Sequence, residues 1–177
     1  MIKFTSFICL LILLSCNSGT PVTSADSTAV NKTDSSKREV SYPYTINYSS
    51  QFEYTDPEKG KIILDAWKDF DNNTLDQSKD KFADTVEMQF PGMKIRASRD
   101  SFFAVTKSYR NLYNSVKASV DVVMSTRSTD KKADWVLVWG REIKTDKKNI
   151  TDTTEVHEVW GFNKEGKIIS LEQFVRN

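Results

Sequence analysis

The chain has 177 residues with 25 basic and 24 acidic side chains, which gives a formal net charge of +1 at neutral pH. This balance excludes strong electrostatic attraction to nucleic acid or to an anionic membrane surface. Both cysteines, Cys9 and Cys16, precede residue 17, so the rest of the chain has no disulfide, cysteine nucleophile or thiolate metal site.

The N-terminus has the layout of a secretory signal. Lys3 provides a positive start, the segment from Phe4 to Leu14 is mostly apolar, and Ser15 precedes Cys16. The apolar segment is shorter than the roughly 20 residues that cross a bilayer. Its final Leu-Leu-Ser-Cys sequence resembles the lipobox of bacterial lipoproteins. This resemblance implies that residues 1–15 are removed as a signal peptide and that Cys16 carries fatty acyl chains such as palmitate. The alternative is an ordinary signal peptide with an incidental cysteine.

The lipobox also implies a location in the bacterial cell envelope. Asn17, and not an aspartate, follows Cys16, which by the habit of lipoproteins indicates the outer membrane, facing the periplasm. Residues 16–50 are rich in Ser, Thr and Asp and predict a flexible tether, because so polar a segment cannot offset its ordering entropy by burial. Alternating aromatic residues over 42–54 predict an extended arm. We place the folded domain at residues 51–177.

Three helices are predicted in the first half of the domain. Asp-Pro-Glu at residues 56–58 is typical of a helix start, and apolar residues at helical spacing continue that helix to Asp71. A short second helix follows, with Phe82 among its buried positions. Ser98 caps a third helix, whose apolar residues follow the 3.6-residue period as far as Val116.

Extended segments dominate the second half. Alternating patterns predict strands over 85–90, 93–97, 120–124, 135–143, 156–162 and 167–175. Helices that gather early and strands that gather late indicate an α+β domain, with helices covering one face of a curved, mostly antiparallel sheet. The later strands carry large apolar residues on both sides, so the uncovered face is a candidate homodimer surface.

Four segments resemble nuclear transport factor 2-like (NTF2-like, SnoaL-like) domains: Ala66–Asn73, Phe82–Val86, Phe90–Gly92 and Glu158–Ile168. The resemblance covers roughly residues 56–177. The resemblance implies a cone-shaped roll in which three N-terminal helices close a pocket against the curved sheet. Family members include isomerases, cyclases and dehydratases, and also modules without known chemistry, so the fold alone does not specify the activity.

The steroid-isomerase branch of this family uses a tyrosine in the first helix, an aspartate at the end of the first strand and an acid in the penultimate strand. Here Ala66 and Trp67 stand near the place of the tyrosine and Phe90 near that of the aspartate, so the general base of that branch is missing. Only the third place keeps an acid, Glu158. By alternation it shares a face with Trp160, where desolvation raises a carboxyl pKa and suits it to general acid–base catalysis.

Two interpretations of Glu158 remain open. In the first it works as a general acid or base, with Tyr109 as a hydrogen-bond donor. In the second it lies at the pocket mouth, solvated or paired with Arg141. His157, the single histidine, is expected on the opposite side of the strand, and one histidine cannot build a multi-histidine metal site. We expect neither a metal nor a cofactor.

The aromatic residues that we expect to line an apolar pocket are Trp67, Phe70, Phe90, Tyr109, Trp139 and Trp160. The first hypothesis is a membrane-anchored, non-catalytic module that binds a small apolar ligand or a partner protein. The alternative is an isomerase, cyclase or dehydratase that uses Glu158 as acid or base. A third is a scaffold that forms homodimers through the sheet. Nucleic acid is not an expected partner.

Overall fold

The computed structural model describes residues 40–176. From Tyr42 onward these residues belong to one compact unit, while of the preceding unit, Met1–Ser41, only the last two residues are described. The predicted signal peptide, Cys16 and most of the predicted tether therefore lie outside the described residues. None of the helices within 40–176 is long and apolar enough to span a membrane.

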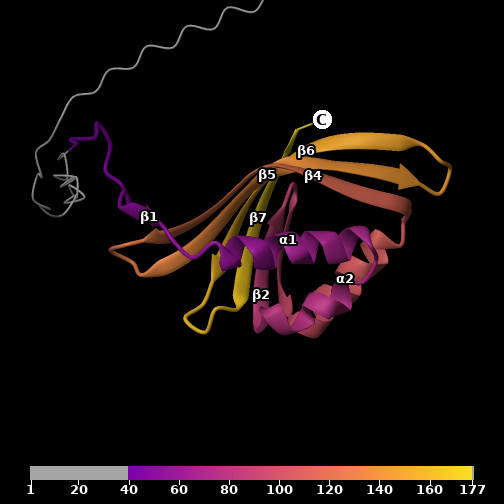
Figure 1. The fold of residues 1–177 in the computed structure, drawn as a ribbon, viewed down its shortest axis with the longest axis horizontal. Coiled ribbons are helices and arrows are strands. Elements are labelled where there is room, and N and C mark those ends of the chain that lie inside the picture. Colours follow the sequence, from indigo (N-terminus) through magenta and orange to yellow (C-terminus); the bar gives the residue numbers. More distant parts are fainter. Residues whose placement is uncertain (1–39, 177) are drawn as a thin grey trace, which may run out of the picture. The chain divides into compact units, whose positions relative to one another are not determined.

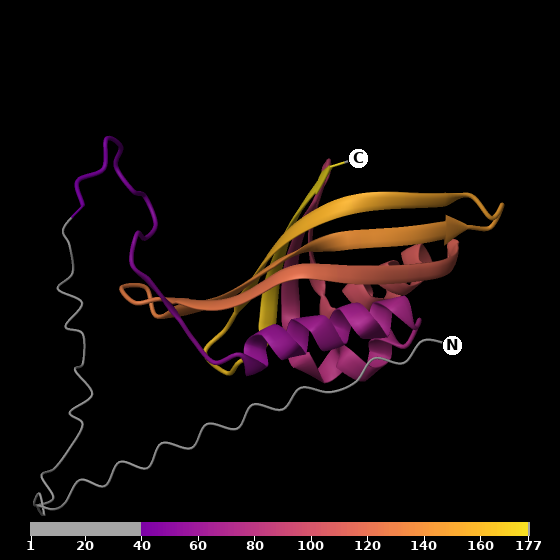
Figure 2. The ribbon, with the colours of Figure 1, turned by 45° about the horizontal axis from the view of Figure 1, so that its top comes forward.

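A seven-stranded sheet frames the part of the chain that the structure describes (Figure 1). Its strands are β1 (Phe52–Tyr54), β2 (Phe82–Phe90), β3 (Met93–Ser98), β4 (Tyr113–Ser128), β5 (Ala133–Asp146), β6 (Thr151–Phe162) and β7 (Ile168–Arg176). Their spatial order is β1-β4-β5-β6-β7-β2-β3, and only the β2–β7 pair is parallel. The long strands β4, β5 and β6 curve over the helices, which gives the sheet a concave face (Figure 2).

Two α-helices, α1 (Glu58–Asp71) and α2 (Arg99–Arg110), and the 3-10 helix η1 (Leu75–Lys81) are the helices of residues 40–176. Both α-helices lie on the concave side of the sheet (Figure 1). The prediction of an α+β domain with helices on one face of a mostly antiparallel sheet agrees with this mixed α+β arrangement.

The expectation of three N-terminal helices is corrected at two points: strand β1 precedes α1, and the middle helix is of the 3-10 type. The short pair of strands expected before the third helix is present as β2 and β3. The hydroxyl groups of Thr74 and Ser78 donate to the Asp69 carboxylate at 3.1 and 2.5 Å and hold the chain in a tight turn. Phe82 is buried as expected, but it is the first residue of β2 and does not belong to a helix.

The end of α2 also differs from the expected one. The Ser98 hydroxyl accepts a hydrogen bond from the Ser101 backbone N–H, which confirms the predicted cap. The helix stops at Arg110, however, and Val116 is a buried residue of β4. Its helical spacing from the residues of α2 was a coincidence, because a strand residue can satisfy the same apolar pattern over a short distance.

Arg110 connects the two α-helices. It is buried, and its guanidinium donates to the carbonyls of Phe70 and Asp71, both at 2.8 Å, and of Tyr113 at 3.2 Å. The last carbonyls of a helix lack partners within the helix. A positive charge is also favourable at that end of the helix dipole. Arg110 therefore fixes the last turn of α1, which carries Phe70 and Asp71 of the site described below, against the start of β4.

The hydrophobic core lies between the helices and the concave face of the sheet. Residue Ile63 of α1 and residues Val136 and Val138 of β5 are completely buried within it. Gly60 lets the first turn of α1 approach β4, because a Cβ atom there would lie 3.1 Å from both Val123 and the Ser125 hydroxyl. This close contact holds α1 along the sheet and positions the inward-facing side chains of its second half.

Candidate functional site

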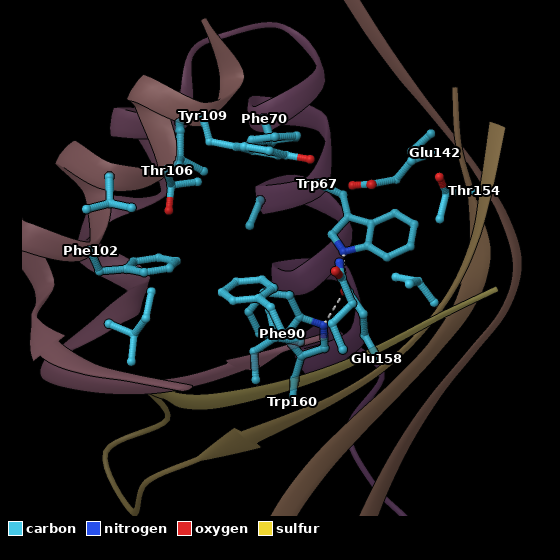
Figure 3. Close-up of a pocket in the computed structure, with 18 of the residues that line it drawn as sticks. Trp67, Phe70, Phe90, Phe102, Thr106, Tyr109, Glu142, Thr154, Glu158 and Trp160 are labelled. Atoms are coloured by element: carbon cyan, nitrogen blue, oxygen red, sulfur yellow. Dashed lines mark hydrogen bonds between the residues drawn. The ribbon is translucent and has the colours of Figure 1, made fainter. Parts of the chain in front are cut away.

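A cavity of about 460 Å³ lies between α1, α2 and the concave face of the sheet (Figure 3). Its volume is within the range of small-molecule sites, about 300–1,000 Å³. Most of its wall is apolar or aromatic, and Figure 3 shows side chains of α2 on one side and Trp67 and Glu158 on the other. The polar residues in the wall are Asp71, Thr106, Tyr109, Glu142, Lys144, Thr154, Glu158 and Gln173.

Glu158 is the most enclosed acid of the cavity wall, with only 4% of its surface exposed. Its Oε2 atom accepts hydrogen bonds from the indole N–H groups of Trp67, at 2.7 Å, and Trp160, at 2.8 Å. Its Oε1 atom accepts one from the side-chain amide of Gln173, at 2.8 Å. Gln173 lies directly opposite Glu158 in the β6–β7 register. The carboxylate therefore receives three donors, all of them uncharged.

Burial raises the pKa of Glu158 from 4.5 to about 7, and the negative charge of Glu142 acts in the same direction. The hydrogen bonds from Gln173, Trp160 and Trp67 oppose this rise because they stabilise the charged form. A carboxyl group with such a pKa exists in both protonation states near neutral pH. It can therefore accept or release a proton under physiological conditions, as an acid–base catalyst requires.

Trp67 reaches Glu158 because the sheet leaves room for its ring. The strand β5 has Gly140 where α1 crosses it, and a Cβ atom at this position would lie 3.2 Å from the Trp67 ring. The same Cβ atom would overlap the backbone carbonyl of Ser119. A side chain at position 140 would thus disturb both the β4–β5 pairing and the indole that binds Glu158.

A second polar group lies on β5, where Glu142 and Lys144 form an ion pair with a 2.9 Å separation. Both side chains are largely buried. Burial acts to lower the pKa of Lys144, but the attraction of Glu142 outweighs it and the pKa lies above the usual value. This ion pair occupies the side of the cavity next to Tyr113, whose ring centroid is 5.9 Å from the Lys144 ammonium.

Asp71 is the third acid of the cavity wall. Its Oδ2 atom accepts a hydrogen bond from the backbone N–H of Ala118 at 3.0 Å and lies 3.9 Å from the Lys68 ammonium. Burial raises the pKa of Asp71, while the Ala118 hydrogen bond and the positive charges of Lys68 and Arg110 oppose the rise. Asp71 therefore has two cationic neighbours.

Aromatic side chains mark the α2 side of the cavity. The rings of Phe70 and Tyr109 are stacked with centroids 6.4 Å apart, as Figure 3 shows. The Tyr113 hydroxyl donates to that of Tyr109 at 3.2 Å. Burial, followed by this hydrogen bond, raises the pKa of Tyr113 to about 12. Tyr109 is itself 42% exposed, so it lies where the cavity opens toward solvent.

The structure brings five of the six expected pocket residues together: Trp67, Phe70, Phe90, Tyr109 and Trp160 all line the cavity. Glu158 lies among them, and the Arg141 guanidinium pairs with Asp121 instead of Glu158. The expectation of a solvated or Arg141-paired Glu158 is therefore corrected.

The expectation that Trp139 lines the pocket is also corrected. Trp139 lies on the opposite face of the sheet and is 39% exposed. Strand β5 turns its smaller residues, Val136, Val138 and Gly140, toward α1, since the helix needs that space. Trp139 instead packs against His157 with ring centroids 5.7 Å apart. His157 thus faces away from Glu158, as the strand alternation predicts.

Several polar residues of the site escaped the sequence analysis, among them Asp71, Glu142, Lys144 and Gln173. Strand alternation in β5 and β7 could have predicted that three of them face inward. Residues 142 and 144 lie on the same strand face as the buried Val138, and Gln173 lies on the same face as the buried Leu171. Among the described residues there is no group of three His, Cys, Asp or Glu side chains arranged to hold a metal ion.

Comparison with solved structures identifies the fold. An NTF2-like protein of unknown function from Exiguobacterium sp. 255-15 has a TM-score of 0.56 at 12% identity, covering 66% of this chain and 98% of its own. A candidate SnoaL-like polyketide cyclase from Shewanella denitrificans has a TM-score of 0.57 at 8% identity, covering 68% and 92%. AusH from Aspergillus nidulans has a TM-score of 0.56 at 14% identity, covering 71% and 88%.

No profile of a known protein family and no curated protein sequence matches the chain. Identities this low establish a shared fold and not a shared activity. The structural neighbours do bear out the fold expected from the resemblance of the sequence. The domain of this chain has the NTF2-like fold.

Proposed function

We propose that the cavity binds a small, mostly apolar molecule, with Glu158 as the polar anchor in its wall. The observation that carries this proposal is a cavity of about 460 Å³ with a largely apolar lining and one deeply buried carboxylate. Burying an apolar ligand surface contributes about 25 cal/mol per Å². A small ligand is favoured over a partner protein for this site, because the apolar groups line a concavity and not a flat surface.

The orienting contact is the Oε1 atom of Glu158. A carboxylate oxygen accepts about two hydrogen bonds, and Oε1 receives one from Gln173 among the described residues. A hydroxyl or amino group on the ligand therefore has an acceptor within the wall. The two indoles on Oε2 hold the carboxylate in place and prevent it from rotating away.

Binding of the uncharged dye N-phenyl-naphthylamine, followed by its fluorescence, tests this proposal. Thr106 lines the cavity, and Thr106→Trp fills part of it, so dye affinity should fall at least about tenfold. Ala104 is an exposed residue of the same helix and is not part of the cavity wall. Ala104→Trp is the matched control and should leave the affinity unchanged. Equal dye binding by the parent protein and Thr106→Trp would contradict the proposal.

We further propose that a lipid on Cys16 anchors the chain to the bacterial envelope, at the periplasmic face of the outer membrane. The support is the sequence that precedes it: a positive start, a short apolar segment and Leu-Leu-Ser before the cysteine. Expression of the full chain in a bacterium with labelled palmitate tests the anchor. Label should enter the parent and Cys9→Ser but not Cys16→Ser. Unlabelled parent protein in the soluble fraction would refute it.

A second candidate function is catalysis, of the isomerase, cyclase or dehydratase type. The observation that favours it is the pKa of about 7 for Glu158 inside the cavity, since a proton-transfer catalyst works best when its pKa is near the operating pH. One structural neighbour is a candidate polyketide cyclase. In this role Glu158 moves the proton, and Tyr109 donates a hydrogen bond to the developing charge.

Deuterium exchange from heavy water into a panel of apolar ketones, followed by NMR, tests the catalytic candidate. Glu158→Gln should abolish any exchange that the parent protein catalyses. Glu155→Gln alters an acid on the other face of the same strand and should retain it. Exchange that survives in Glu158→Gln would remove Glu158 as the acid or base.

We also propose that two copies associate through the uncovered face of the sheet. Trp139, His157 and Phe174 lie in one cross-strand row on this face, and Phe174 is 55% exposed. Large exposed apolar side chains in a row are typical of association surfaces. Sedimentation of residues 42–177 tests this. We expect a dimer that Phe174→Glu dissociates, and a monomer at high concentration would contradict it.

A further inference from the structure

The charges of the cavity wall are unequally compensated. Three carboxyl groups, Asp71, Glu142 and Glu158, and one ammonium group, Lys144, belong to the described residues that line the cavity. Lys144 forms its ion pair with Glu142. Asp71 is close to Lys68 and Arg110, neither of which lines the cavity. Within residues 40–176, the hydrogen-bond partners of Glu158 include no cation.

All three hydrogen-bond partners of Glu158 are uncharged. Trp67, Trp160 and Gln173 donate hydrogen bonds but carry no charge. A buried carboxylate is strongly destabilised unless a cation pairs with it. The three donors thus hold the carboxylate at a fixed place in the wall and leave its charge unneutralised. A positive group inside the cavity would supply the missing partner.

The aromatic lining of the cavity also favours a positively charged group. The faces of aromatic rings attract cations, and indole attracts them most strongly. Trp67, Phe70, Phe90 and Tyr109 all contribute to the wall, and Figure 3 shows them around the space next to Glu158. An anion entering this space meets aromatic faces and three carboxyl groups. The one ammonium group in the wall is already engaged by Glu142.

We propose that the molecule bound by this cavity is an apolar amine, whose protonated amino group pairs with Oε1 of Glu158 while its hydrocarbon part lies among the aromatic rings. This inference rests on the proposed function and names its ligand class. The amino group donates to the acceptor position of Oε1 that Gln173 leaves open. The ligand ammonium and Glu158 then form a charge-assisted hydrogen bond within an apolar surrounding, where such bonds are strongest.

Three probes of equal chain length separate charge from apolar burial: octylamine, octanol and octanoate, each titrated calorimetrically into the protein at neutral pH. Octylamine should bind at least about tenfold more tightly than octanol, because a charge-assisted hydrogen bond replaces a neutral one. Octanoate should bind more weakly than octanol, since its charge is repelled by the wall.

Two variants assign the effect to Glu158. Glu158→Gln keeps the size of the side chain and an oxygen for the two indoles, and Gln173 can turn its amide to match. We expect this variant to lose the preference for octylamine, so that octylamine binds no more tightly than octanol. Glu155→Gln removes a carboxylate that binds Arg176 on the other face of β6, and it should keep the preference.

The outcomes distinguish this inference from the proposed function. If octanol binds as tightly as octylamine, or octanoate binds best, the amine inference is wrong while an apolar site remains. If none of the three probes binds, both are wrong. If Glu158→Gln fails to fold, the order of the three probes in the unmodified protein still decides. An octylamine preference that persists in folded Glu158→Gln would also overturn the assignment.

Discussion

The pH dependence of folding offers a direct test of the environment of Glu158. We consider Glu158→Gln, which removes the ionisable group and retains its shape. In the folded protein the carboxyl pKa is raised from 4.5 to about 7, because burial disfavours the charge. In the unfolded chain the group is exposed and titrates near its ordinary value. The folded and unfolded states therefore bind different numbers of protons between these two pH values.

The size of the effect follows from this difference in pKa. A rise from 4.5 to about 7 corresponds to about 3 kcal/mol. Between these values the folded state keeps a proton that the unfolded state has released, so the free energy of unfolding falls as the pH rises. The destabilisation that results from ionising the buried Glu158 carboxyl group is absent below about pH 4 and complete above about pH 8. Glu158→Gln lacks this dependence, and all other groups cancel in the comparison.

Urea denaturation of both proteins across this pH range is the assay. The free energy of unfolding of Glu158→Gln, relative to that of the parent, should increase by about 3 kcal/mol from low to high pH. A difference that stays constant within about 0.5 kcal/mol would refute the reasoning. It would mean that water or a cation reaches Glu158 and that its folded pKa is ordinary.

Three further changes test the surroundings of the site. Trp67→Phe removes one donor to the carboxylate, so NMR titration should show a further rise in the pKa of Glu158, and stability at high pH should fall by about 1–2 kcal/mol; an unchanged pKa would exclude the hydrogen bond. Gly140→Ala places a Cβ atom against the Ser119 carbonyl and should cost about 2 kcal/mol or more, measured by urea denaturation, whereas a neutral effect would show that β4 yields easily. Arg110→Met keeps most of the volume but leaves the Asp71 carbonyl without its donor and removes one of the two donors of the Phe70 and Tyr113 carbonyls, so thermal unfolding should reveal a loss of about 2 kcal/mol; a loss under about 0.5 kcal/mol would mean that water replaces the guanidinium.

The place of Glu158 could be predicted from the sequence because strand alternation is a strong local signal. Val156, Glu158 and Trp160 share one face, and that face is buried. A polar residue flanked by apolar ones at a period of two stands out in any strand. Of its three hydrogen-bond donors, Trp160 lies on the same face of the same strand, so the alternation places it beside Glu158. Trp67 and Gln173 could not be predicted in the same way, because they come from α1 and β7 and meet Glu158 only through the tertiary fold.

The prediction that Trp139 lines the pocket was wrong because tertiary packing, and not the local pattern, decides which face of β5 lies inward. Strand alternation separates the residues of β5 into two faces, but which face lies inward depends on what packs against it. Large size favours burial in general. Here α1 lies so close that the strand presents Val136, Val138 and Gly140 to it. The glycine in this run indicates a close approach, and it was the available signal that Trp139 faces outward.

The boundaries of α2 and β4 illustrate the limit of local patterns. Apolar residues at helical spacing continue beyond Arg110, yet the chain turns into β4 there. The turn is stabilised by the contacts of Arg110 with the end of α1, some forty positions earlier in the chain. Such long-range contacts override short-range periodicity, and nothing near Arg110 in the sequence announces them.

The most direct test of the central claim uses the four tryptophans of the chain. Trp67 and Trp160 donate to Glu158 within the cavity wall, whereas Trp135 and Trp139 are not among the lining residues. The indole N–H resonances of a nitrogen-labelled sample are recorded while octylamine is added. We predict that the signals of Trp67 and Trp160 shift with saturation and that those of Trp135 and Trp139 stay in place. Uniform shifts of all four signals, or shifts of the Trp135 and Trp139 signals alone, would contradict ligand binding at Glu158.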